Sequence, residues 1–131
     1  MAEARDRRRA AYKDLSAAVH ALSEVFWKME DIDRTADRAE RIEAMGRMKV
    51  DCRARLNEVT RASRDVLLEG PTAVARAARA LSGSAVATHH LLVRLHDADD
   101  EPRSEYDRAY RRFQNHHLSF VELAREALEV R

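Results

Sequence analysis

The sequence has few of the residues that build tight turns, disulfides or membrane spans. It contains three glycines and two prolines in 131 residues, too few for the many turns of a β-rich fold. The single cysteine excludes an intrachain disulfide and favours a reducing compartment. The opening residues lack the apolar segment of a secretion signal, and no apolar run reaches the length of a membrane span. We therefore expect a cytoplasmic protein with no membrane partner.

Apolar residues recur with helical spacing along most of the chain. Charged residues make up 36% of the sequence and hydrophobic residues 45%, which is typical of long helices with charged outer faces. Alternating steps of three and four residues predict helices at about residues 5–31, 38–69, 71–96 and 104–130. Long helices with short connections predict an all-α fold, an antiparallel up-down-up-down four-helix bundle that forms a single domain over residues 1–131.

The same spacing predicts which side chains face the core. In the first helix the stripe comprises Tyr12, Leu15, Val19, Leu22, Phe26 and Met29, widened by Ala18 and Val25. In the second it comprises Ile42, Met45, Lys49, Cys52, Leu56, Val59, Ser63 and Val66. In the third it comprises Val74, Ala78, Leu81, Ala85, Thr88, Leu92 and Leu95, and in the fourth Tyr106, Ala109, Phe113, His116, Phe120, Leu123, Ala127 and Val130.

The third predicted helix is apolar or small on both faces, as an enclosed helix is. It contains no acidic residue. Gly83, Val86, His90 and Val93 lie opposite its core stripe, and the fourth helix has a second stripe of Leu118, Val121 and Leu128. Trp27 also faces away from the core stripe of its helix. These eight residues predict an interface, either of a homodimer or with a different protein partner.

Two connections can be read from turn chemistry. Gly70-Pro71 predicts a corner in which the glycine adopts a positive φ and the proline starts the next helix. Between the third and fourth helices, Asp100 or Ser104 is the predicted helix cap. The acidic run over residues 97–101 would then lie unfavourably at the end of the third helix.

Residues 58–78 read E-V-T-R-A-S-R-D-V-L-L-E-G-P-T-A-V-A-R-A-A, a long helix that ends in Gly-Pro before an alanine-rich helix. This segment resembles small, Ala/Arg-rich all-helical proteins of actinobacteria whose function is uncharacterised. The resemblance implies a helical bundle and an actinobacterial source, and it brings no catalytic residues.

Candidate chemistry is confined to one interior layer. None of the six histidines has another three or four residues away, so we expect no metal site and no cofactor. Antiparallel pairing places Lys49, Cys52, Thr88 and His116 at similar levels, which allows a polar pocket for a small molecule or a Cys–His nucleophile. Buried cysteine more often acts as a small apolar residue. No phosphate-binding loop or hydrolase motif is present.

The functional prediction follows from these exclusions. The basic opening of the chain is interrupted by Asp6 and has no interleaved aromatic residue, and the formal net charge is +1, so we expect no nucleic-acid partner. We predict a non-enzymatic interaction or structural bundle that self-associates. A small-molecule-binding or catalytic bundle that uses the interior layer is the alternative.

Overall fold

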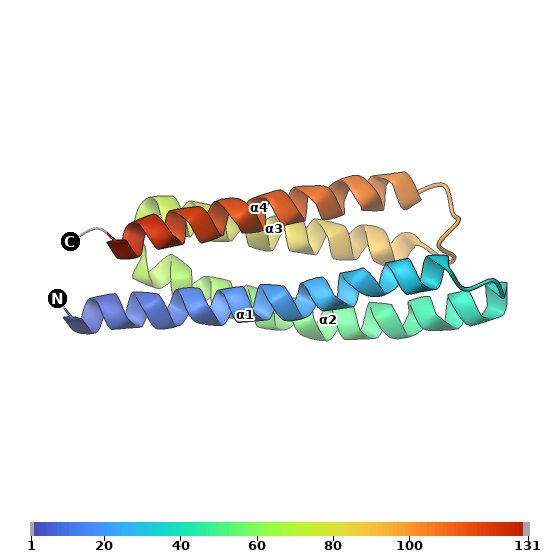
Figure 1. The fold of residues 1–131 in the computed structure, drawn as a ribbon, viewed down its shortest axis with the longest axis horizontal. Helices are drawn as coiled ribbons and strands as arrows, with labels where there is room; N and C mark the ends of the chain where they lie inside the picture. The colour runs from blue at the N-terminus through green and yellow to red at the C-terminus, as the bar shows by residue number, and fades with distance from the viewer. Residues whose placement is uncertain (1, 130–131) are drawn as a thin grey trace.

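The computed structural model describes residues 2–129, which form four antiparallel helices joined by short connections. They are α1 (Ala2–Asp33), α2 (Arg38–Glu69), α3 (Thr72–Arg94) and α4 (Arg103–Glu129). Figure 1 shows a long rod in which both chain termini and the α2–α3 corner lie at one end, and the other two connections lie at the opposite end. The described residues contain no strand. The predicted all-α four-helix bundle is confirmed.

The heptad spacing places the expected side chains in a common core. Every predicted core residue of the first and third helices is buried. The predictions on α2 and α4 need correction. On α2, Ile42 is 40% exposed and Lys49 is half-buried, while Met48 is buried. On α4, His116, Leu123 and Ala127 are half-buried, while Ala124 is buried. His89 is buried beside Thr88, which the spacing did not predict. Val130, predicted to face inward, lies outside the described residues.

The Gly70-Pro71 corner joins α2 to α3 as predicted. Gly70 has φ 62° and ψ −162°, its N–H donates to the carbonyl oxygen of Val66, and its peptide bond to Pro71 is cis. The hydroxyl of Tyr12 donates to the carbonyl oxygen of Gly70 over 2.6 Å. The corner is therefore attached to α1 about a third of the way along that helix, although the two segments are far apart in sequence.

Two arginine–aspartate pairs join the connections at the opposite end of the rod. Arg41 donates two hydrogen bonds, of 2.9 and 3.1 Å, to the carboxylate of Asp97, which is buried. Arg103 makes a similar forked contact, of 2.6 and 2.8 Å, with Asp33. The arginine side chains come from α2 and α4, so each pair fixes a connection to a helix that is distant in sequence.

The acidic run after α3 thus has a structural role that the sequence reading missed. Asp97 is held by Arg41, and this hydrogen bond lowers the pKa of the Asp97 carboxyl. Asp100 does not cap α4 as predicted, because its carboxylate accepts hydrogen bonds from the backbone N–H groups of His96 and Asp97. In the first turn of α4, the N–H groups of Glu105 and Tyr106 donate to the carbonyl oxygen of Pro102 instead.

The four helices are not packed equally closely around the core. α1 packs closely on α2, α2 on α3, and α3 on α4, so the cyclic order is α1, α2, α3, α4. The remaining neighbours, α1 and α4, have the fewest contacts. The backbones of α1 and α4 are therefore the most widely separated neighbours, with aromatic side chains between them, and the side between α2 and α3 lies opposite to theirs.

Candidate functional site

The predicted interior layer does not form one polar cluster. Lys49 donates a hydrogen bond to the carbonyl oxygen of Leu95, and the hydroxyl of Thr88 donates to the carbonyl oxygen of Ser84 over 2.8 Å. His116 is half-buried on α4. Lys49 and Thr88 thus each bind a backbone carbonyl rather than another residue of the layer, and His116 lies at the edge of the core. The fourth, Cys52, has a partner that the sequence reading missed.

Cys52 lies against His89 in the closed interior. The distance from the thiol sulfur to Nδ1 of His89 is 3.3 Å. Burial raises the pKa of Cys52 to about 12, and burial also lowers the pKa of His89. Both groups are therefore neutral near pH 7, and the thiol is hydrogen-bonded rather than ionised. A neutral, enclosed thiol is a weak nucleophile.

An aromatic cluster fills the core next to this pair. Phe26 of α1 contacts Tyr110 and Phe113 of α4, each at a ring-centroid distance of 5.4 Å. Tyr106 is 2% exposed, and burial strongly raises the pKa of its hydroxyl. Within residues 2–129, the hydroxyl oxygens of Tyr106 and Tyr110 are buried and have no hydrogen-bond partner. These two groups are the polar atoms of the core that the fold leaves unsatisfied.

The side of the bundle between α1 and α4 carries aromatic, histidine and aliphatic side chains. Trp27 of α1, which is 49% exposed, lies beside Tyr110 of α4 and makes an edge contact with His20. His117 of α4 is half-buried, and its pKa is lowered by burial and then by the nearby His20. Burial therefore favours the neutral form of His117 on this seam.

The second stripe of α4 continues along the same seam. Val121 is one turn beyond His117, so it lies on the α4 face that meets α1. Leu128 follows two turns later, and its carbonyl oxygen accepts a hydrogen bond from Arg5 of α1. Leu118 adjoins Val121 and is 63% exposed. We call Trp27, Tyr110, His117, Leu118, Val121 and Leu128 the α1–α4 face.

The predicted interface residues of α3 lie on the opposite side of the bundle. His89 contacts Cys52 of α2, so Val86 and Val93, three residues before and four after it, lie on the side of α3 that faces α2. Val93 is 49% exposed, whereas Val86 is packed partly against the core. Gly83 and His90 are exposed. The two predicted stripes are therefore separate surfaces and not one continuous patch.

Three apolar residues gather on this second side. Ile42 and Val50 of α2 are 40% and 71% exposed, and they are two turns apart with Gly46 between them. Val93 of α3 lies level with Val50 along the bundle, because Cys52 contacts His89 and Lys49 reaches Leu95. We call Ile42, Gly46, Val50, Val86, His90 and Val93, together with Arg53, Arg64 and Arg79, the α2–α3 face.

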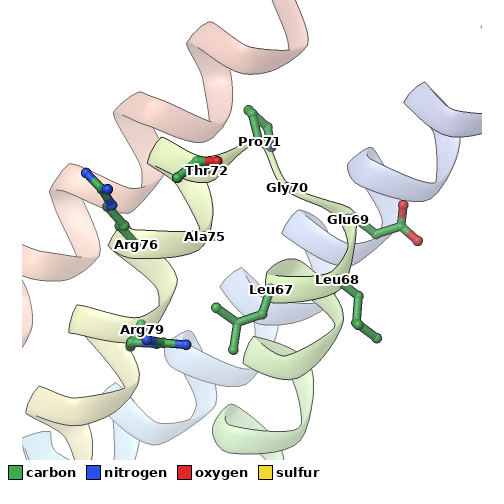
Figure 2. A pocket seen from close by; sticks show the side chains of 9 residues that line it. All are labelled: Leu67, Leu68, Glu69, Gly70, Pro71, Thr72, Ala75, Arg76 and Arg79. Carbon is green, nitrogen blue, oxygen red and sulfur yellow. The ribbon is translucent and has the colours of Figure 1, made fainter.

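The α2–α3 face ends in a hollow at the Gly70-Pro71 corner. Figure 2 shows this hollow of about 460 Å³, which is lined by residues 67–72, Ala75, Arg76 and Arg79. The side chain of Arg79 crosses the space between the two helices, whereas Arg76 points away from α2. Glu69 of α2 points away from α3, and its carboxylate lies 3.6 Å from the guanidinium of Arg7 on α1. The hollow is thus basic on its α3 side.

The described residues meet neither the requirements of a metal site nor those of a membrane-spanning helix. Within residues 2–129, no three His, Cys, Asp or Glu side chains lie close enough together to hold a metal ion. None of the four helices, over those same residues, is long and apolar enough to cross a bilayer. No family model, curated protein or solved structure matches the chain.

Proposed function

We propose that the protein is a non-enzymatic, cytoplasmic helical bundle that acts by self-association, and that two copies bind each other through their α1–α4 faces. The observation that carries this proposal is the position of Trp27, half-exposed on the seam where the helix backbones approach each other least, between α1 and α4. Tryptophan at the centre of an apolar surface is the residue most often found to dominate association energy. Leu118, more exposed still, extends the same surface along α4.

The charge pattern of α1 is compatible with a two-fold pairing. Arg9 and Lys13 lie before His20, and Glu24 and Asp31 lie after it. In an antiparallel pair centred at the level of His20, the basic half of one copy faces the acidic half of the other. Such a pairing brings Lys13, seven residues before His20, to Trp27, seven residues after it, where a cation–π contact can form. An isologous interface of this kind closes into a dimer.

The interior supports a non-enzymatic role. The Cys52 thiol is 0% exposed and un-ionised, and the hollows among the described residues lie at the surface between helices rather than around Cys52. A substrate would have to separate α2 from α3 in order to reach the thiol. The alternative, a small-molecule-binding bundle, draws on one observation: the buried, unpartnered hydroxyl of Tyr106 would offer a bound molecule a hydrogen bond.

Sedimentation velocity over about 1 to 100 µM protein tests self-association. We expect the unmodified chain to sediment as a dimer and a Trp27→Glu, Leu118→Glu variant to sediment as a monomer with unchanged helical circular dichroism. Val50→Glu, on the opposite side of the bundle, is the matched control and should leave the dimer intact. A monomer over the whole range for the unmodified chain would refute the proposal. Loss of the dimer with Val93→Glu alone would assign it to α3 instead.

A further inference from the structure

The α2–α3 face carries arginines and, beyond Val50, no acidic side chain of α2; Glu43, two turns before Val50, is paired with Arg47. α3 has no acidic residue, and of its three arginines Arg79 extends toward α2, Arg76 points away from it and Arg94 lies 4.0 Å from Glu105 of α4. α2 has both signs, but its acidic residues from Asp51 onward lie toward α1: Asp51, Glu58, Asp65 and Glu69 line the surface grooves between these two helices. These acidic residues share the α1–α2 side of the helix with Arg55 and Arg61, and so leave the opposite side of α2 without a carboxylate from Asp51 onward.

Arginines of α2 lie on the side that faces α3. Lys49 reaches the carbonyl oxygen of Leu95 on α3, and Arg53, one turn later on α2, therefore lies on the same side. Arg64 follows eleven residues later, which is three helical turns, and so lies on the same side. Arg53, Arg64, Arg76 and Arg79 are all exposed, and among the described residues none of the four has an ion-pair partner.

The apolar end of the same face includes a glycine that the bundle does not need. A Cβ atom at Gly46 would have nothing within 4 Å, so no close approach inside the chain requires glycine there. Glycine in the middle of a helix lowers helix stability relative to alanine. Gly46 lies between Ile42 and Val50, whose side chains are exposed. A backbone of another molecule could approach α2 closely at this one point.

We propose that the α2–α3 face binds an acidic amphipathic helix of a different protein. The apolar side chains of that helix lie on Ile42, Val50 and Val93, its backbone approaches Gly46, and its carboxylates meet Arg53, Arg64 and Arg79. From Ile42 to Arg64 the face is ~33 Å long, which is the length of a helix of about 22 residues. Apolar anchors with complementary charge beside them are the usual form of helix-in-groove recognition.

Charge selects this occupant over two others. A second copy of the chain has no carboxylate on this face to meet the arginines: a parallel pair would place arginine against arginine, and an antiparallel pair would bury arginines against Ile42 and Val50 without a partner. A nucleic acid would suit the arginines, but this face has no aromatic side chain for a base to stack on, and its other end is aliphatic. This binding is separate from self-association through the α1–α4 face, since the two faces lie on opposite sides of the bundle.

Designed peptides of about 22 residues, matched to the length of the face, test the proposal by fluorescence anisotropy. The first carries leucine on one helical face and glutamate on the other. The second replaces each glutamate with lysine, the third replaces each leucine with serine, and a single-stranded DNA of similar length is the fourth probe. We expect the first to bind and to weaken as salt rises from about 50 to 300 mM. The other three should bind at least about tenfold more weakly.

Variants of the protein locate the binding. Arg53→Glu with Arg64→Glu should weaken the acidic peptide at least about tenfold, whereas Arg111→Glu with Arg125→Glu, two exposed arginines of α4, should not. Gly46→Gln fills the point of close approach and should weaken binding although it raises helix stability, so a folding defect cannot explain the loss.

The proposal is overturned if the unmodified chain fails to bind the acidic peptide at about 100 µM, or if the lysine peptide binds equally well. Tighter binding of DNA that depends on Arg53 and Arg64 would also overturn it and assign the face to nucleic acid. Trp27→Glu with Leu118→Glu, which removes self-association, should leave peptide binding unchanged. Each proposal can therefore fail without the other.

Discussion

Replacing Gly70 with alanine should destabilise the bundle through backbone conformation alone. With φ 62° and ψ −162°, Gly70 occupies a region of backbone space that is essentially restricted to glycine. A Cβ atom there would meet only the backbone nitrogen of Thr72, at 3.9 Å, so steric contact with neighbours adds nothing. The conformational penalty is about 1–3 kcal/mol. The lower entropy of alanine in the unfolded chain offsets ~0.4–1 kcal/mol of it, which leaves a net loss of roughly 0.5–2 kcal/mol.

The other two glycines supply controls of opposite sign. Gly46 and Gly83 are helical, and a Cβ atom at either would have nothing within 4 Å. Alanine at these positions should raise the free energy of unfolding by up to ~1 kcal/mol, because it restores helix propensity without a clash. The three variants make the same chemical change, the addition of one methyl group, in different backbone conformations.

Urea unfolding, followed by circular dichroism at one fixed protein concentration, measures the three changes. With a slope of about 2 kcal/mol per molar urea, Gly70→Ala should lower the midpoint by roughly 0.25–1 M, and Gly46→Ala and Gly83→Ala should raise it. The fixed concentration is needed because self-association would shift the midpoint. A midpoint for Gly70→Ala at or above that of the unmodified chain would refute the reasoning about the corner.

Two further predictions concern buried titratable groups. Cys52, whose pKa burial raises to about 12, should react with a maleimide far more slowly in the native protein than in denaturant; labelling at the rate of an exposed thiol would contradict its enclosure. His89 and His117 have pKa values lowered chiefly by burial, so the unfolded chain binds more protons than the folded one as the pH falls through about 6.5. The stability present above that pH should therefore decrease below it, and His117→Gln should reduce the decrease; an unchanged pH profile of the urea midpoint would count against this cause.

Much of the fold could be predicted because each helix carries its own periodicity. The α1 stripe from Tyr12 to Met29 was read correctly, since a three-four repeat depends only on local spacing. Gly70 was predicted for the same reason, as a glycine before a proline between two periodic segments marks a helix end. At the start of α2 the repeat was misplaced: Ile42 is exposed and Met48 is buried. A straight helix drifts about 20° per heptad from a strict seven-residue repeat, so a stripe extended over 24 residues loses its phase.

Contacts between distant segments could not be predicted in the same way. Counting residues from the corner placed Thr88 opposite Cys52, but the contact is made by His89, one residue and about 100° around the helix. Counting gives the level along the bundle and not the direction of the side chain. The Arg41–Asp97 pair joins residues 56 positions apart, and no local pattern relates them. The sequence therefore predicts that the acidic residues 97–101 destabilise the end of α3, whereas in the structure Arg41 of α2 pairs with Asp97.

The division of the predicted interface into two faces follows from the same limit. A helical wheel shows that Val86 and Val93 share a side of α3 and that Val121 and Leu128 share a side of α4, but it does not show which neighbouring helix each side adjoins. In the bundle the α3 stripe lies toward α2 and the α4 stripe toward α1. A dimer formed through the α1–α4 faces leaves both α2–α3 faces outward, one on each copy. Such a dimer presents two sites for acidic helices, so a partner with two acidic helices on a linker that spans both sites would bind the second site intramolecularly, and its overall affinity would exceed that of either helix alone.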